Sequence, residues 1–252
     1  MCQSLPDTTG NAKFKHAVDL FGAHDDSGEL LERSRLELLD ILRVNPRHAP
    51  AIAYLGLIAL EAGNAQQADS FFTASLAIDS ACAEAHAGRA QAFRAKHEWG
   101  KGLEEARLGV KLAPNSPVIL WELCGELLFS AESTITDRRA NEALPYLLRL
   151  ISMNNDDRQA HLELAKLYER ANQMADAVPH YREVLRIGQT DEDSDVWVYT
   201  VHLDVARCLE ADKKYADAAA ELQKYLAQIK EYGASGDEVS KIEKQIEELR
   251  RR

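Results

Sequence analysis

The chain has 252 residues, of which 46% are hydrophobic, so it has enough apolar side chains for a continuous buried core and is not disordered throughout. Its 13 glycines and 7 prolines are too few for a turn-rich β fold, and its recurrent Ala, Leu, Glu, Lys and Arg favour an all-α fold. The formal net charge of -11 opposes binding to a phosphate backbone, and we expect no nucleic-acid partner.

The sequence predicts neither a membrane span nor a targeting segment. No apolar stretch reaches about 18 residues, and the N-terminal region lacks the apolar core of a signal peptide. The four cysteines form no C-x-x-C pair, which argues against a zinc site and a disulfide framework and favours a reducing compartment: Cys2, Cys82, Cys124 and Cys208. We therefore expect a cytoplasmic location and no membrane insertion.

A repeating pattern of small residues is the main signal, because a period near 34 residues indicates a stacked helical array. The first set has spacings of 34, 34, 35, 40 and 41 residues: Gly22, Gly56, Ala90, Gly125, Ala165 and Ala206. A second set follows 12 residues later in all repeats but the fourth, where the interval is 18: Ser34, Ala68, Gly102, Ala143, Ala177 and Ala218. Small residues at these spacings are typical of helices that cross closely, so each repeat is predicted to hold two helices.

From the N-terminus, we expect a tail over 1–12, an array of helix pairs over 13–231, and a loop and final helix over 232–252. The six repeats cover about 15–48, 49–82, 83–117, 118–157, 158–191 and 199–231. The final helix has apolar residues at helical spacing, which predicts a cap on the exposed end of the array: Val239, Ile242, Ile246 and Leu249. A homo-oligomeric coiled coil through this helix is the alternative, but so short a seam does not favour it.

The fourth and fifth repeats carry the fullest motifs. WELCGELL places Trp121, Cys124, Gly125 and Leu128 at the spacing of a W-x2-L-G-x2-Y block, and HLELAKLY follows the same spacing forty residues later. With the A-x3-F block that follows, the sequence resembles the tetratricopeptide repeat family over roughly residues 13–231, most weakly in the first repeat. This resemblance implies a right-handed α-solenoid whose first helices line a concave groove for an extended peptide or a helix.

The resemblance also implies which side chains face that groove. The matching positions are Tyr54, Leu57, Gln91, Arg94, Glu122, Glu126, Phe129, Lys166, Arg170 and Arg207. The predicted groove is apolar near its start and mixes both charge signs toward its end. The family's set of Lys, Asn and Arg that holds a peptide's terminal carboxylate is not matched here, so a receptor for chaperone tails is not supported.

Two irregularities and two prolines are interpreted as local features. The longer intervals near 131–139 and 190–197 are predicted loops, and the acidic TDEDSD segment in the second lacks the Gly and distal Glu of a calcium-binding EF-hand. Pro145 and Pro179 each follow a small alanine by two residues, and we expect both in the first turn of a second helix.

No catalytic motif is present. The sequence contains no G-x-S-x-G, P-loop or H-E-x-x-H motif, so we expect no enzyme, no cofactor and no metal. His86, His161 and His202 share one repeat position, but successive repeats hold them apart, and we interpret them as packing residues.

The leading hypothesis is a protein-binding scaffold or adaptor whose partner is a protein or peptide. Two alternatives remain open. The chain could be a regulatory or accessory domain of a larger enzyme or of a secretion or assembly machine, or it could be a self-assembling structural array.

Overall fold

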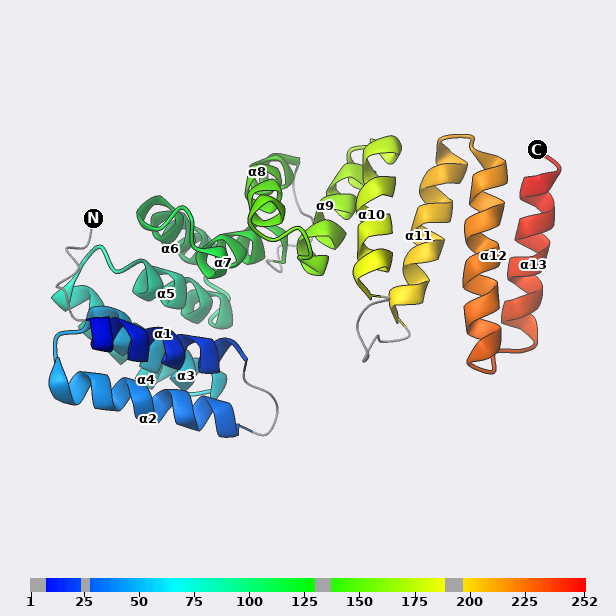
Figure 1. Ribbon diagram of the computed structural model, residues 1–252. Helices are drawn as coiled ribbons and strands as arrows, with labels where there is room; N and C mark the ends of the chain where they lie inside the picture. Colours follow the sequence, from blue (N-terminus) through cyan, green and yellow to red (C-terminus); the bar gives the residue numbers. More distant parts are fainter. Residues whose placement is uncertain (1–7, 24–27, 130–136, 189–196) are drawn as a thin grey trace. The chain divides into compact units, whose positions relative to one another are not determined.

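The computed structural model describes residues 8–23, 28–129, 137–188 and 197–252, and these contain thirteen α-helices and no strand (Figure 1). The helices are α1 Thr8–Gly22, α2 Glu29–Val44, α3 Ala49–Glu61, α4 Ala65–Ile78, α5 Ala83–Ala95, α6 Trp99–Leu112, α7 Pro117–Leu128, α8 Asp137–Met153, α9 Arg158–Arg170, α10 Met174–Gly188, α11 Trp197–Ala211, α12 Tyr215–Glu231 and α13 Asp237–Arg250. The predicted all-α class is confirmed: six successive helix pairs are followed by one final helix.

The chain divides into two compact bodies, an N-terminal body over Met1–Arg139 and a C-terminal body over Ala140–Arg252. In the N-terminal body the first helices of successive pairs contact one another, α3 with α5 and α5 with α7, while α4 and α6 each contact the first helix of the next pair. In the C-terminal body contacts run from α9 to α10, α11, α12 and α13 in order. Each pair therefore packs mainly on its neighbours in sequence, as in a solenoid.

The turn inside a pair has the same backbone form in four repeats. One residue takes a left-handed conformation at the same place in each turn, with φ of 72° at Gly63, 61° at His97, 58° at Asn172 and 60° at Lys213. Side-chain caps then begin some of the helices: Asn64 accepts from the Gln67 amide that starts α4, and Asp157 accepts from the Ala160 amide in α9. Short polar sequences thus reverse the chain within a few residues.

Phe72 of α4 explains the small residues of the second repeat. Its side chain is fully buried, and a Cβ atom built at Gly56 of α3 would lie 2.5 Å from its ring. A Cβ built at Gly88 of α5, in the next repeat, would lie 2.2 Å from the same ring. The ring is therefore held between glycines of two successive first helices, and neither position has room for a methyl group.

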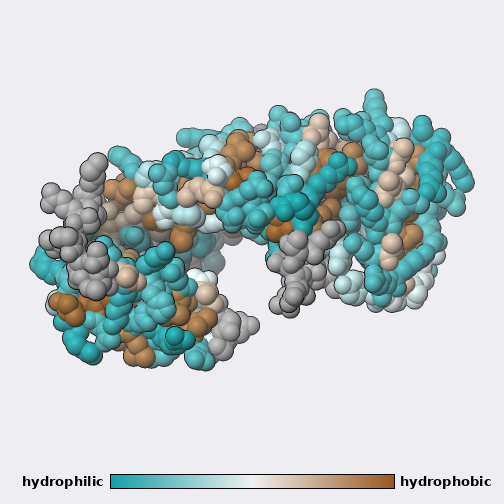
Figure 2. All heavy atoms as spheres, viewed as in Figure 1, coloured by the Kyte–Doolittle hydropathy of each residue, from teal (hydrophilic) through white to brown (hydrophobic). Residues whose placement is uncertain are grey.

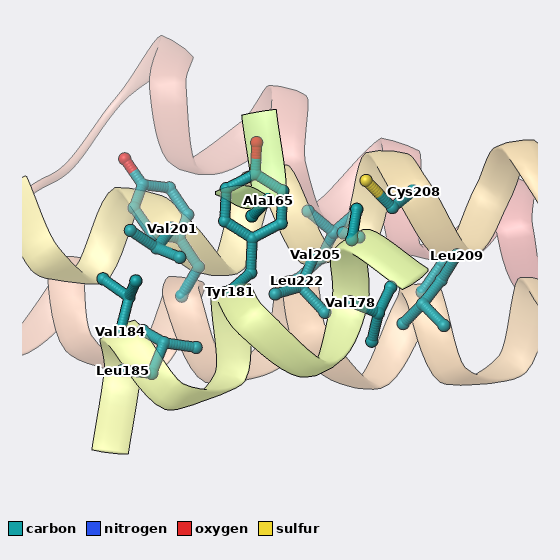
Figure 3. Close-up of a cluster of buried hydrophobic side chains, with 14 of the residues drawn as sticks. Ala165, Val178, Tyr181, Val184, Leu185, Val201, Val205, Cys208, Leu209 and Leu222 are labelled. Atoms are coloured by element: carbon teal, nitrogen blue, oxygen red, sulfur yellow. The ribbon is translucent and has the colours of Figure 1, made fainter. Parts of the chain in front are cut away.

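In the C-terminal body Tyr181 of α10 plays the corresponding part. Figure 3 shows its ring among Ala165 of α9 and Val201 and Val205 of α11, all buried. The same cluster continues to α13, which inserts its buried apolar residues Ile242, Ile246 and Leu249. The other face of α13 is charged, and the surface over it is mostly hydrophilic in Figure 2, so α13 covers the end of the array as predicted.

The predicted register of the first repeat is wrong. Gly22 is the last residue of α1, and no atom lies within 4 Å of a Cβ built there. Ala17 lies opposite Ser34 instead, since the buried Ser34 hydroxyl donates to the Ala17 carbonyl oxygen at 2.7 Å. The connection between the helices is longer in this repeat, so the spacing of 12 residues placed the crossing point one turn too late.

The predicted position of the two prolines is also wrong. Pro145 and Pro179 both lie inside helices, α8 and α10, because these helices begin at Asp137 and Met174, well before each proline. A proline there leaves the carbonyl oxygen four residues earlier without its usual amide donor, which favours a bend. The predicted loops near 131–139 and 190–197 fall mostly on 130–136 and 189–196, outside the described residues.

Candidate functional site

The ten predicted groove residues differ in exposure. Tyr54, Leu57, Glu122 and Glu126 are buried, at 1 to 7% exposure. Gln91 and Arg94 are partly buried, while the other four are exposed: Phe129, Lys166, Arg170 and Arg207. All lie on or at the end of first helices, but only the partly buried and exposed ones present atoms to a partner in this conformation.

In the N-terminal body four of these residues form one polar network between α5 and α7. Arg94 Nη1 donates to Oε1 of Glu122 at 2.9 Å and to Oε1 of Glu126 at 3.0 Å. Gln91 Nε2 donates to the other oxygen of Glu122 at 2.8 Å. Arg94 keeps 32% of its side chain exposed, and these two bonds leave its Nε and Nη2 atoms unused. The network thus has a buried acidic end and an exposed cationic end.

Two glycines of the repeat pattern make room for this network. A Cβ built at Gly102 of α6 would lie 2.8 Å from Oε2 of Glu126, and one at Gly125 of α7 would lie 3.1 Å from Nη1 of Arg94. Small residues at these positions therefore accommodate polar side chains, whereas Gly56 in the second repeat accommodates an aromatic ring. Sequence spacing alone does not separate the two uses.

Burial governs the ionisation of the two glutamates. Oε2 of Glu126 is buried and has no hydrogen-bond partner among the described residues. Burial raises the pKa of Glu126 from 4.5 to about 7 against the lowering effect of Arg94, and the nearby Glu122 raises it further. Burial likewise raises the pKa of Glu122, although Arg94 and Gln91 oppose this. One arginine serves two carboxyl groups, so near neutral pH part of the population holds Glu126 protonated.

The C-terminal body repeats this arrangement with the charges reversed. Arg207 of α11 binds Glu169 of α9 through two bonds, Nε to Oε1 at 2.6 Å and Nη2 to Oε2 at 3.0 Å. Arg207 also donates to Asp204 at 2.7 Å, and the hydroxyl of Tyr181 donates to Glu169 at 2.8 Å. These hydrogen bonds, the largest from Glu169, hold the pKa of Arg207 above its usual range, so its positive charge persists. Lys166 pairs with the buried Glu163 at 3.0 Å.

Sequence reasoning missed the acidic partners Glu163, Glu169 and Asp204. A signal for Glu169 was present. Arg94 and Glu169 each stand four residues after the small residue of a first helix, and Glu126 and Arg207 each stand one residue after the small residue of the next first helix. Opposite charges at these two positions predict an ion pair between successive first helices, with either sign first.

The histidines at the shared repeat position bridge the two helices of their own pairs, which is the structural packing predicted for them. His86 contacts Glu105 at 2.6 Å, His161 contacts His180 at 2.9 Å, and His202 contacts Glu221 at 2.8 Å. Within the described ranges no cluster of three or more His, Cys, Asp or Glu residues is arranged to hold a metal ion.

The described cysteines are buried free thiols. They are Cys82, Cys124 and Cys208. Burial raises the pKa of Cys82 to about 12 and that of Cys208 to about 11. These two thiols stay protonated at neutral pH and are poor nucleophiles. Among the described helices, none is long and apolar enough to cross a membrane.

Comparison with solved structures gives the same fold at low sequence identity. The protein YrrB, a tetratricopeptide repeat protein with an unusual peptide-binding site, aligns with a TM-score of 0.60 and 15% identity over 75% of this chain and 91% of YrrB. Pseudomonas aeruginosa pilF aligns with a TM-score of 0.63 and 16% identity over 94% of this chain and 97% of its own. PilW, a type IV pilus biogenesis factor, aligns with a TM-score of 0.61 and 16% identity over 94% of this chain and 99% of PilW.

Sequence comparison adds a family match. No curated protein sequence matches the chain. A tetratricopeptide repeat model matches residues 135–192, which include the fifth repeat with its HLELAKLY motif. Together with the helix pairs, the glycines at their crossings and the fold shared with solved repeat proteins, this match identifies the chain as a tetratricopeptide repeat protein.

Proposed function

We propose that the chain is a non-catalytic scaffold that binds a protein or peptide segment on the surface of its first helices. In the N-terminal body this surface consists of Gln91, Arg94 and Phe129; in the C-terminal body it consists of Lys166, Arg170 and Arg207. We call these six residues the first-helix surface. Their side chains are partly or fully exposed, whereas the other four predicted groove residues are buried beneath or between helices.

The observation that carries the proposal is the way Arg94 is held. Two buried glutamates fix one nitrogen of its guanidinium group, while the rest of the group reaches solvent near the end of α7, where Phe129 is 54% exposed. A cation held in one orientation loses little conformational entropy on binding, and an exposed aromatic side chain supplies apolar contact area. The fold neighbour YrrB has a peptide-binding site, which supports the same kind of partner here.

The proposal is tested by affinity capture with variants of the first-helix surface. Arg94→Gln, Phe129→Ser and Lys166→Gln each remove one contact group, and Lys111→Gln, on the exposed side of α6, is the matched control for loss of a positive charge. A thermal melt of each variant establishes that it is folded. We expect at least one partner to be lost from the first three variants and retained by the control. Equal recovery of every partner by all four variants would refute the surface assignment.

An accessory role in a larger assembly is the second candidate. It is favoured by the fold neighbour PilW, a type IV pilus biogenesis factor. In this case the captured partners would be subunits of one complex that elute together with the chain by size-exclusion chromatography. A self-assembling array is less favoured, because the charged outer face of α13 offers little apolar area for a further repeat. Mass measured over a concentration series would separate these cases.

A further inference from the structure

Four repeats join their two helices through a histidine on the first helix. In three of them the partner on the second helix is a glutamate, and in the fifth repeat it is another histidine. The pairs are His16 with Glu37, His86 with Glu105, His202 with Glu221, and His161 with His180. The fifth repeat thus has an imidazole at the position where a carboxylate occurs elsewhere.

The proton positions in the His161–His180 pair follow from its neighbours. Nε2 of His161 lies 3.1 Å from the carbonyl oxygen of Asn155, which can only accept, so this nitrogen carries a proton. In the neutral ring Nδ1 of His161 is therefore an acceptor, and Nδ1 of His180, 2.9 Å away, donates to it. His161 is only 3% exposed, and the ring of His180 stacks on Tyr168 at 5.7 Å. Neither ring can turn away without losing these contacts.

Protonation affects this pair and the carboxylate pairs in opposite ways. A glutamate opposite a histidine favours the charged imidazolium. Two imidazoles can share one added proton, but a second proton leaves two N–H groups facing each other at hydrogen-bond distance with like charges. The ionisable groups acting on His180 are His161 on α9, and Asp176 and Glu183 on α10 itself. No ionisable group of α11, which also packs on α10, is among those acting on His180 in the described structure.

We propose that the His161–His180 pair is a pH-sensitive contact that loosens α9 from α10 in mildly acidic solution, while the histidine–glutamate pairs of the other repeats hold. Burial, reinforced by His161, lowers the pKa of His180 below 6.5 in the folded chain, although the two acidic residues oppose this. The contribution of the pair to stability is then fully present above about pH 6.5 and is lost as the pH falls through this value. The inference does not depend on the identity of any binding partner.

The test compares amide hydrogen exchange of the full chain at about pH 7.5 and about pH 5.5, after correction for the intrinsic pH dependence of exchange. We expect protection in α9 and α10 of the wild-type chain to fall by about tenfold for each unit by which the pKa of His180 is lowered. Protection in α5 and α6, which the His86–Glu105 pair joins, should change less.

His180→Glu restores the pair found in the other repeats and should remove the acid-induced loss in α9 and α10. His97→Gln, which removes an exposed histidine in an inter-helix turn, is the matched control and should keep the wild-type response. An NMR titration of His180 in the wild-type chain provides a readout even if the His180→Glu variant does not fold. Equal protection of wild-type α9 and α10 at the two pH values, or a His180 midpoint at or above the unperturbed value, would overturn the proposal.

Discussion

Gly88→Ala is the sharpest test of the repeat packing, because it adds one methyl group where the structure has no space. The new Cβ would lie 2.2 Å from Cε1 and 2.3 Å from Cζ of the fully buried Phe72 ring. The ring cannot retreat toward α3, since a Cβ at Gly56 would already lie 2.5 Å from it on that side. Repacking of a closely packed core by one extra methyl group costs about 1–3 kcal/mol.

Helix propensity acts in the opposite direction and must be separated from this cost. Alanine is favoured over glycine in a helix by about 1 kcal/mol. Gly100→Ala in α6 is the matched control, because no atom lies within 4 Å of a Cβ built there. We expect the control to be neutral or slightly stabilising, and Gly88→Ala to lower the free energy of unfolding by roughly 1–2 kcal/mol once both terms are included.

Urea unfolding followed by circular dichroism measures both variants. Adding Phe72→Leu to Gly88→Ala should restore part of the loss, because the smaller side chain frees space beside the new methyl group. The reasoning would be refuted if Gly88→Ala were as stable as Gly100→Ala, or if Phe72→Leu cost the same in both backgrounds.

Three further predictions concern other parts of the chain. Because the pKa of Glu126 is raised to about 7 in the folded state, its contribution to stability is present below about pH 4.5 and lost as the pH rises through 7, so urea midpoints of Glu126→Gln should decline less between about pH 5 and about pH 8 than those of the wild type. Lys213→Gly relieves a left-handed backbone conformation, with φ of 60°, and should raise the melting temperature, corresponding to about 0.5–1 kcal/mol; a lower melting temperature would contradict the turn assignment. Ile246→Asp places a charge in the contact of α13, where Ile246 is 4% exposed, and should cost about 3 kcal/mol or more and speed proteolysis of the C-terminal body, whereas the exposed Gln245→Asp should not.

The spacing of small residues predicted the helix pairs because it records a physical requirement of close crossing. Gly56 and Gly102 both lie where a Cβ would meet a neighbouring side chain, as the spacing indicated. The first repeat escaped the rule because its connection is longer, so Ala17 and not Gly22 lies opposite Ser34. The start of α8 was misplaced for a similar reason, since Pro145 lies far inside the helix.

The candidate surface was predicted less completely than the fold. Family positions correctly selected first helices, but they gave no measure of burial: Glu122 and Glu126 share a single arginine away from solvent, at 7% and 1% exposure. Charged side chains are rarely buried without a partner, so burial here depended on Arg94, a contact across repeats that no local pattern encodes. The charge-reversed pair of Glu169 and Arg207 shows that the contact could have been found by comparing positions in successive repeats.

The most direct test of the central claim locates a captured partner on the chain. Hydrogen exchange of the full chain with and without that partner reports protection helix by helix. The account predicts that added protection lies on first helices, at α5 and the end of α7 or at α9 and α11, with little change on the outer sides of α4, α6 and α12. Protection confined to those second helices would contradict the proposal that the first-helix surface binds the partner.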